Sequence, residues 1–291
     1  MTTGAAIRYC IVTSVRDEET YICKTVESVL AQTILPEEWI IVDDGSTDAT
    51  GKIIDEYARQ YSWITALHRE DRKVRSTGGG IHGFLFGVDA LRSKQWDFLV
   101  NLDGDLSFAP DYFERCFEYF RQNPELGIGG GTIHNKVGNE LLQESVAGFH
   151  VRGATKIYRR ACWESIGGML AGLGWDTFDE VKANMKNWKT RSFPDLQVIH
   201  YRYTGTAGGL WWGLVKDGQA DYIVGYHPLF FAAKCVRRLF RSPYLFGSIG
   251  LFYGWCKGYW SRVPRVPDEE FIRYVRKQQL NRLFGRETIW R

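Results

Sequence analysis

The chain has 291 residues, of which 44% are hydrophobic and 24% are charged, and its formal net charge is +3. These values are typical of a globular protein large enough to bury a core, and they exclude a disordered chain or a fibrous repeat. The charge is uneven, because residues 232–291 carry 13 Lys and Arg against 4 Asp and Glu. We therefore expect the two parts of the chain to face different partners.

Neither the cysteines nor the apolar runs indicate a secreted or membrane-spanning protein. The six cysteines are scattered, without a CxxC pair, so we expect reduced thiols and no zinc site. The first residues, MTTGAAIRYCIVTS, lack the pattern of a secretory signal. The longest uncharged apolar run, 244–256, is shorter than the roughly 18 residues that a spanning helix needs. We expect a cytoplasmic protein.

Strand-like apolar runs alternate with helical patterns over residues 7–102. Strands are predicted at 7–13, 39–42, 63–68 and 98–102. Between the first two, Ile22, Val26 and Val29 recur with the spacing of one helix face, and Ile54 and Tyr57 continue such a pattern before the third. This alternation predicts an α/β fold with a parallel sheet, in which ligands lie beyond the carboxyl ends of the strands.

Two adjacent acids follow the second predicted strand, just before a helical pattern begins. Because polar side chains at that place can face a ligand, Asp43 and Asp44 are candidate binding residues. The alternative is helix capping, in which a side-chain oxygen accepts free N–H groups of the first turn. Capping is the expected role of Ser46, Thr47 or Asp48, but it does not account for both Asp43 and Asp44.

A second pair of acids follows the fourth predicted strand, in the sequence NLDGD. Asp103 and Asp105, one residue apart, can hold a hard divalent cation, which takes oxygen ligands and bound phosphates. A plain turn is the alternative, because turns are rich in Asp and Gly. The cation is favoured because Asp43 and Asp44 end another strand of the same predicted sheet.

The motifs VDDGSTD and NLDGD, in this order, resemble those of the family 2 glycosyltransferases, which use nucleotide-sugar donors. The opening VTSVRDEETYICKTVESVLAQT and the segment RGATKIYRRACWESIGG extend the resemblance, which covers residues 6–205. Ser14 stands where the family often has Pro, and Asp17 where Asn is usual. The family's Glu-Asp pair appears as Trp175 and Asp176. The QxxRW motif of processive synthases is absent, which favours transfer of a single sugar.

The resemblance implies an α/β fold of the GT-A type. This fold is a Rossmann-like, mostly parallel sheet flanked by helices, and here a C-terminal helical amphipathic extension would follow it. The catalytic domain would span 1–227, with a nucleotide-binding half at 1–105 and an acceptor half at 106–227. Residues 228–291 would form the basic, aromatic helical tail.

The resemblance also implies roles for the acids that end the strands. Asp44 would bond the base of the nucleotide, and Ser14, Asp17 and Asp43 would lie in the same pocket. Asp103 would face the ribose and the metal.

Further roles concern the diphosphate and its metal. Asp105 would bind a divalent cation, Mg²⁺ or Mn²⁺, that bridges the diphosphate. Arg75 is a candidate phosphate contact, with a solvated loop residue as the alternative. His200, after an apolar strand, is a candidate ligand of the metal or the diphosphate, with a structural hydrogen bond as the alternative. Arg202 could pair with the leaving diphosphate, because its planar fork matches phosphate geometry.

Transfer to a hydroxyl also needs a base. The resemblance indicates Asp176, at the start of a predicted helix, and Asp179 and Glu180 are alternatives one turn further. The non-catalytic alternatives are helix capping for Asp176 and a solvated surface charge for Asp179 and Glu180. A base on the face opposite the leaving group implies direct displacement with inversion at the anomeric carbon.

The tail mixes Phe, Tyr, Trp and Leu with Lys and Arg, as amphipathic helices at a membrane surface do. The alternative is a helical hairpin packed on the catalytic domain or on another subunit of a homo-oligomer. If the tail meets a membrane, a lipid-linked acceptor is the natural substrate, and Trp211 and Trp212 either help bind it or belong to the core. No nucleic-acid-binding motif is present, and the N-terminal part is acidic.

The motifs together predict a metal-dependent, inverting, hexosyltransferase-like enzyme that acts on a nucleotide-diphosphate sugar in glycan or polysaccharide assembly. Its acceptor would be a hydroxyl or a phosphate. The alternative is a protein that binds nucleotide sugars on the same fold without turnover. A sugar-phosphate nucleotidyltransferase should have a basic, glycine-rich loop after the first strand, and the acidic SVRDEET stands there instead.

Overall fold

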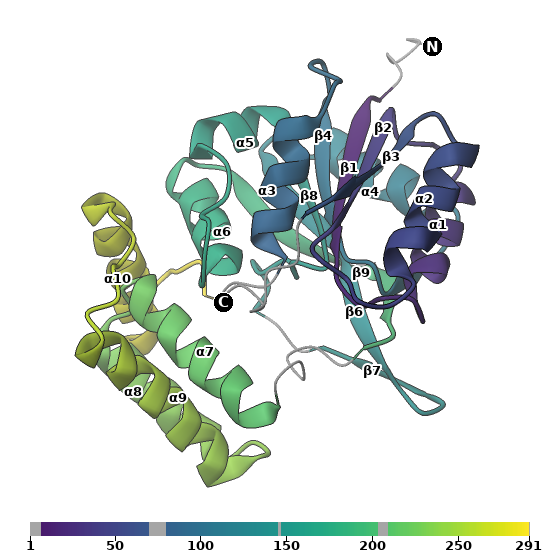
Figure 1. Cartoon of the computed structure of the whole chain (residues 1–291). Coiled ribbons are helices and arrows are strands. Elements are labelled where there is room, and N and C mark those ends of the chain that lie inside the picture. Colours follow the sequence, from purple (N-terminus) through teal and green to yellow (C-terminus); the bar gives the residue numbers. More distant parts are fainter. Residues whose placement is uncertain (1–6, 70–79, 145–146, 203–208, 291) are drawn as a thin grey trace.

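The computed structural model describes residues 7–69, 80–144, 147–202 and 209–290 (Figure 1). Within these ranges, there are ten helices, and nine strands form one sheet. The strands are β1 (Tyr9–Val15), β2 (Glu38–Asp43), β3 (Ile64–His68), β4 (Phe98–Leu102), β5 (Leu106–Phe108), β6 (Leu126–Val137), β7 (Glu140–Gln143), β8 (Thr155–Arg159) and β9 (Lys189–His200). The helices are α1 (Ile22–Leu30), α2 (Thr50–Gln60), α3 (Ile81–Ala90), α4 (Tyr112–Gln122), α5 (Arg160–Ile166), α6 (Trp175–Met185), α7 (Leu210–Ile223), α8 (Pro228–Arg238), α9 (Tyr244–Trp260) and α10 (Glu269–Leu283).

The sheet runs in the order β3-β2-β1-β4-β8-β6-β9-β5, and β7 pairs with β6 outside this path. β1 is parallel to both β2 and β4, and β2 is parallel to β3. β8 runs antiparallel between β4 and β6. β9 is parallel to β6 and carries β5 antiparallel on its other side. The sheet is therefore parallel in its first half, as the alternating pattern predicts, and mixed in its second half.

Helices cover both faces of this sheet. One apolar core lies beneath α1, α2 and α4 and includes Val26, Ile54 and Phe117, and a second lies beneath α3, α5 and α6 and includes Phe84 and Cys162. The central strands β1, β2 and β4 are buried almost throughout, which explains their nearly continuous apolar sequence. The predicted α/β architecture is thus observed. The first strand lies two residues further along than the expected 7–13, at Tyr9–Val15.

The C-terminal helices gather to one side of the α/β layers (Figure 1). α7 and α9 pack so closely that a Cβ atom on Gly218 would lie 2.0 Å from the carbonyl oxygen of Leu251. A Cβ atom on Gly254 would lie 2.0 Å from the carbonyl oxygen of Val215. Glycine is required at both positions because the two backbones nearly touch.

The same helices also contact the α/β part through α6 and α10. Phe178 of α6 meets Phe271 of α10 with ring centroids 4.8 Å apart, and Val181 and Val275 belong to the same buried cluster. The domain boundary expected after residue 227 stays a prediction. It would separate α7 from α9, the helix on which α7 packs most extensively.

The α7–α9 crossing leads to a stability prediction. Gly254→Ala should lower the free energy of unfolding by about 1–3 kcal/mol, because the added methyl group would force the two backbones apart. Thermal unfolding followed by circular dichroism measures the change. Gly148→Ala is the matched control, since a Cβ atom there meets nothing within 4 Å. Equal melting temperatures for the two variants would contradict the tight crossing.

Candidate active site

Three of the predicted polar positions meet at the carboxyl ends of neighbouring strands. Ser14 lies near the end of β1, Asp43 ends β2, and Asp103 follows β4 directly. Because β2 and β4 both pair in parallel with β1, these three ends lie at one edge of the sheet. The edge is where an α/β sheet of this kind takes its ligand.

The loops after β1 and β2 are tied to each other. The Asp17 carboxylate accepts the Thr47 N–H at 2.9 Å, and the Ser46 hydroxyl accepts the Asp17 N–H at 3.0 Å. The Glu19 N–H donates to Asp48 at 3.1 Å, and the Glu19 carboxylate accepts the Ala49 N–H at 2.8 Å. Asp17 holds a left-handed backbone, with φ of 55°. These bonds make the two loops one surface.

This arrangement corrects the capping expectation for two of the three residues. Ser46 binds the neighbouring loop, and Thr47 donates both its N–H and its hydroxyl to Asp17. Asp48 does serve the start of α2, because its carboxylate accepts the Thr50 N–H at 2.9 Å. Burial acts against ionisation of Asp48, but its hydrogen bonds outweigh it and lower its pKa.

The two adjacent acids have different partners. Asp43 accepts the Ser46 N–H at 2.8 Å and lies 3.3 Å from His68 Nδ1, so it closes the turn after β2. Asp44 forms an ion pair of 2.6 Å with Arg69, and both side chains are largely buried. Arg69 was not identified from the sequence. It lies just past β3, a place that the motif pattern did not mark.

Ser14 has a buried hydroxyl without a hydrogen-bond partner among the described residues. A Cβ atom on Gly83 of α3 would lie 2.1 Å from this oxygen, so only glycine leaves room beside it. A buried hydroxyl that lacks a partner costs free energy unless a ligand or water supplies one. Ser14 therefore fits its predicted place in a ligand pocket.

Asp103, Asp105 and His200 form a cluster that could hold a metal ion. Each offers one ligand atom, and these atoms lie within 4.8 Å of one another. His200 ends β9 and pairs in register with Leu106, which brings its Nε2 to 3.2 Å from Asp105 Oδ2. Burial, followed by the charge of Asp105, raises the pKa of Asp103 to about 6. A half-buried and a buried carboxylate so close together favour a positive charge between them.

The donor set fits a divalent cation of the expected kind. Two carboxylates and one imidazole suit Mn²⁺ well, and Mg²⁺ also accepts carboxylates with waters and phosphates completing its shell. A plain turn at Asp103 and Asp105 does not by itself account for the histidine that β9 brings to Asp105.

Asp176 lies in the first turn of α6 and keeps a partly exposed side chain, 28% accessible. Its Oδ1 lies 2.7 Å from the Lys156 ammonium, and its Oδ2 lies 3.6 Å from His150 Nε2. Burial acts to raise its pKa, but Lys156 and His150 outweigh burial and lower it to about 2. Gly174 occupies the N-cap position, so capping does not explain Asp176.

The two alternative bases are fully buried. Asp179 contacts Lys156 at 3.1 Å and accepts a short hydrogen bond from the Tyr158 hydroxyl. Glu180 accepts the Val151 N–H at 2.7 Å and lies 2.8 Å from His150 Nδ1. The alternative interpretation of Asp179 and Glu180 as solvated surface charges is therefore wrong, and neither side chain is open to an acceptor. Among the three acids, the geometry favours Asp176.

Arg152 interacts electrostatically with both this cluster and the candidate metal ligands. Its Nε lies 2.6 Å from Glu144, and its side chain is mostly buried. Burial acts to lower its pKa, but the charges of Glu144, Asp176 and Asp103 raise it. Arg152 therefore interacts electrostatically with both Asp103 and Asp176. The segment RGATKIYRR carried this residue in the family resemblance, but nothing in the sequence distinguished it from a surface arginine.

The two arginines predicted at the diphosphate have different outcomes. Arg202 donates to the Asp17 carbonyl oxygen at 3.0 Å and lies 2.8 Å from the Glu18 carboxylate. It thus lies against the loop after β1, beside the donor edge, and a diphosphate contact stays a prediction. Arg75 lies outside the described residues.

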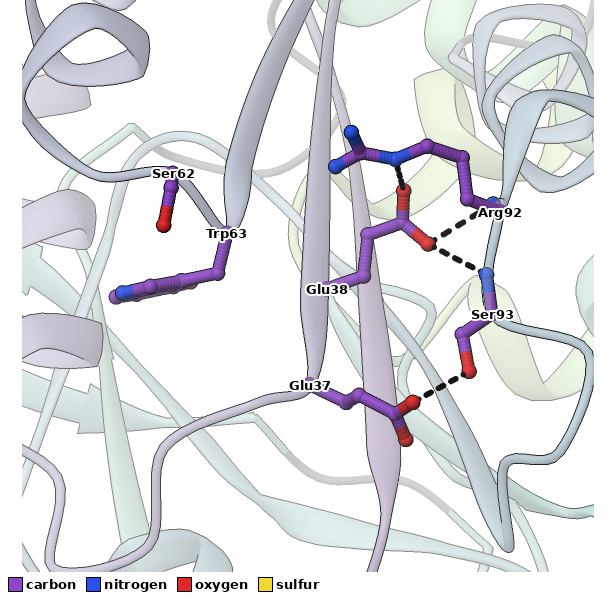
Figure 2. Close-up of a pocket in the computed structure, with 6 residues that line it drawn as sticks. All are labelled: Glu37, Glu38, Ser62, Trp63, Arg92 and Ser93. Carbon is purple, nitrogen blue, oxygen red and sulfur yellow. Dashed lines mark hydrogen bonds and ion pairs between the residues drawn. The ribbon is translucent and has the colours of Figure 1, made fainter.

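A separate pocket of about 340 Å³ lies at the opposite edge of the sheet, where β2 and β3 begin. Figure 2 shows Glu38 turned toward Arg92 and Ser93, and Trp63 on the other side. Glu38 accepts the N–H groups of both Arg92 and Ser93 at 2.9 Å, so it anchors the chain after α3. None of the predicted site residues lines this pocket.

The buried cluster around Lys156 leads to a second stability prediction. Lys156→Met should lower the free energy of unfolding by about 3–5 kcal/mol, because it leaves the buried Asp179 and Glu180 without their cation. Lys189→Met is the control, since Lys189 pairs with Glu125 on the surface. Chemical denaturation measures both. A Lys156→Met variant as stable as the control would contradict the electrostatic role.

The sequence matches known glycosyltransferases over more than half of its length. Residues 10–169 match the family described as Glycosyl transferase family 2. EpsH of Bacillus subtilis is 26% identical over 166 residues, which cover 57% of this chain and 45% of EpsH. A polyprenol monophosphomannose synthase of Mycolicibacterium smegmatis is 29% identical over 144 residues, which cover 44% of this chain and 52% of that protein. The matches thus span about half the length of these relatives.

Solved structures agree on the fold. The mannosyltransferase PcManGT from Pyrobaculum calidifontis, in complex with GDP-Man and Mn²⁺, superposes with a TM-score of 0.58 at 13% identity and covers 98% of this chain and 89% of its own. TarS of S. aureus in complex with UDP-GlcNAc gives 0.58 at 15% identity, over 94% of this chain and 83% of its own. These matches confirm the expected GT-A fold. The motif order, the fold and the family match together show that the chain belongs to glycosyl transferase family 2.

Proposed function

We propose that the protein transfers one sugar from a nucleotide-diphosphate donor to an acceptor hydroxyl or phosphate, with inversion and with the help of a divalent cation. The observation that carries this proposal is the placement of Asp176, partly exposed, within the same electrostatic field as the Asp103, Asp105 and His200 cluster.

The donor nucleotide would bind at the edge formed by β1, β2 and β4. Asp44 would accept hydrogen bonds from the base, and Ser14 would supply its unpaired hydroxyl. Because Arg69 already pairs with Asp44, the arginine would fix the carboxylate in one orientation before the ligand arrives. Asp17 and Asp43 would support this edge through their bonds within the loops.

The leaving diphosphate would lie near Asp103, Asp105 and His200, which would hold Mg²⁺ or Mn²⁺. The cation supplies positive charge where the nucleoside diphosphate gains negative charge. Arg202 lies against the loop after β1, where it pairs with Glu18. If that ion pair broke, Arg202 would add a second positive charge at the diphosphate.

Asp176 would receive the proton of an acceptor hydroxyl. Its pKa of about 2 keeps the carboxylate ionised at neutral pH, and Lys156 holds it in place. Asp179 and Glu180 would act only through Lys156 and His150. A phosphate acceptor carries its own charge and needs no base, and Arg152 would then be its natural partner.

We also propose that the acceptor is carried by a lipid at a membrane surface, as part of glycan or polysaccharide assembly. Two relatives support this, because their names specify a polyprenol-linked and a dolichyl phosphate-linked reaction. The basic, aromatic helices that follow the catalytic part are consistent with such a location.

Nucleotide binding can be tested without knowing the acceptor. A thermal-shift series with UDP, GDP, dTDP and CMP, with and without Mn²⁺, should reveal one stabilising nucleotide for the wild type. Asp44→Ala should abolish that shift, whereas Asp55→Ala, which removes an exposed acid next to His68, should keep it. Asp48→Ala should lower the melting temperature and keep the shift. A full shift in Asp44→Ala would refute the assigned base contact.

Turnover can be tested by release of nucleoside diphosphate from the donor. Asp176→Asn should slow transfer to a hydroxyl by roughly 100-fold to 10,000-fold, the usual contribution of a general base. Asp105→Ala should abolish the cation-dependent release of nucleoside diphosphate. Asp111→Asn, on the exposed start of α4, is the matched control. Wild-type protein that binds a nucleotide sugar but releases no nucleoside diphosphate would support a binding protein instead.

A further inference from the structure

Helix α9 is largely apolar, but only the parts of its surface that face α7 and α8 are buried. Its glycines Gly250, Gly254 and Gly258 lie on the face that packs against α7, where Gly250 meets Leu214 and Gly258 meets Tyr222. The opposite face is exposed to solvent, and we call it the α9 face. Its large side chains are Leu245, Ile249, Phe252 and Trp260, and it is bordered by Tyr253 and Tyr259, whose rings also contact Trp211 and Tyr222 of α7.

The α9 face follows helical spacing and is strongly exposed. Ile249 follows Leu245 by four residues, Phe252 follows Ile249 by three, and Trp260 follows Tyr253 by seven, which places these side chains on one side of the helix. The exposed fractions reach 62% at Leu245, 56% at Phe252 and 74% at Trp260. The neighbouring helix α8 adds Val236, and Phe240 follows it, 79% exposed. An apolar surface of this kind indicates an interaction site.

Charge distinguishes between possible partners for this surface. Residues 222–267 contain seven Lys and Arg and no Asp or Glu. Arg237 and Arg241 are exposed beside α8, and Arg262 is exposed just after α9. Large apolar side chains next to cations, without anions, complement a lipid surface with negative headgroups.

The length of the helices determines how they could meet a bilayer. None of the described helices is long and apolar enough to cross a membrane. α9 has 17 residues, and its glycine face is taken up by α7. The helix could therefore lie in the plane of the interface and present the α9 face to the acyl chains.

We propose that the α9 face is a docking surface for an anionic membrane. The aromatic and aliphatic side chains enter the headgroup boundary, and Arg237, Arg241 and Arg262 contact negative headgroups. The inference deepens the proposed lipid-linked acceptor and rests on it. α7 lies between this surface and the site in the sense that it packs on the glycines of α9 and the charge of its Asp217 helps to raise the pKa of Arg152.

Vesicle flotation tests the docking surface in the absence of donor and acceptor. The full chain should float with vesicles of phosphatidylcholine mixed with phosphatidylglycerol, and high salt should release it. With phosphatidylcholine alone it should float much less. A variant with Leu245→Ser, Phe252→Ser and Trp260→Ser should lose flotation. Arg237→Ser and Arg241→Ser together should weaken partitioning by roughly fivefold for each cation removed.

The control variant changes exposed apolar residues elsewhere. Val137→Ser with Leu142→Ser, on the β6–β7 hairpin, removes side chains that are 46% and 48% exposed and should float like the wild type. Nucleotide thermal shifts should be unchanged in all variants, which establishes that they are folded and separates failure of docking from failure of the proposed function.

Two results would overturn the docking surface. One is a wild type that stays in the aqueous fraction with anionic vesicles at low salt. The other is a dimer, detected by light scattering, that the triple variant converts to monomers, because a second copy would then cover the α9 face. Flotation that holds while donor turnover is absent would leave the docking surface in place and refute only the proposed activity.

Discussion

The site depends on how positive charge is distributed among buried carboxylates. Lys156 has no exposed surface, yet its ammonium lies within 3.1 Å of Asp176, Asp179 and Glu180. Burying one cation with several anions is costly unless every group has partners. Tyr158, His150 and the Val151 N–H supply the remaining partners. The start of α6 therefore has a fixed position relative to β8, and the orientation of Asp176 follows from it.

The same principle applies at the other end of the site, with different cations. Asp103 and Asp105 have His200 nearby, and Arg152 is shared with Glu144. Burial, followed by the charge of Asp105, raises the pKa of Asp103, and His200 and Arg152 oppose that rise. At the donor edge, Arg69 balances Asp44 directly. The three clusters thus differ in which cations the protein itself supplies, and the one that brings Asp103, Asp105 and His200 together is the one where a divalent cation would bind.

The sequence was sufficient to predict the features that show a regular hydrophobic periodicity or a known motif. The parallel strands β1 to β4 were found because each is a short apolar run followed by a helix, and the acids at their ends were found by position. Lys156, Arg69 and His150 were not found, because their importance comes from partners distant in the sequence. A lysine within a strand carries no local sign that it is buried. The prediction that Ser46 and Thr47 cap α2 is wrong, because both residues hydrogen-bond to Asp17 in the loop after β1 instead.

The contact between Arg202 and Glu18 spans 184 positions of the chain. Together with the pairing of β5 and β9, it means that the edge which holds Asp17 and Asp105 is completed only when β9 is in place. Contacts between such distant segments form slowly, because the loop between them must close first. A nascent chain would therefore assemble β1 to β4 early and acquire a complete donor edge late, after most of the catalytic part has been synthesised.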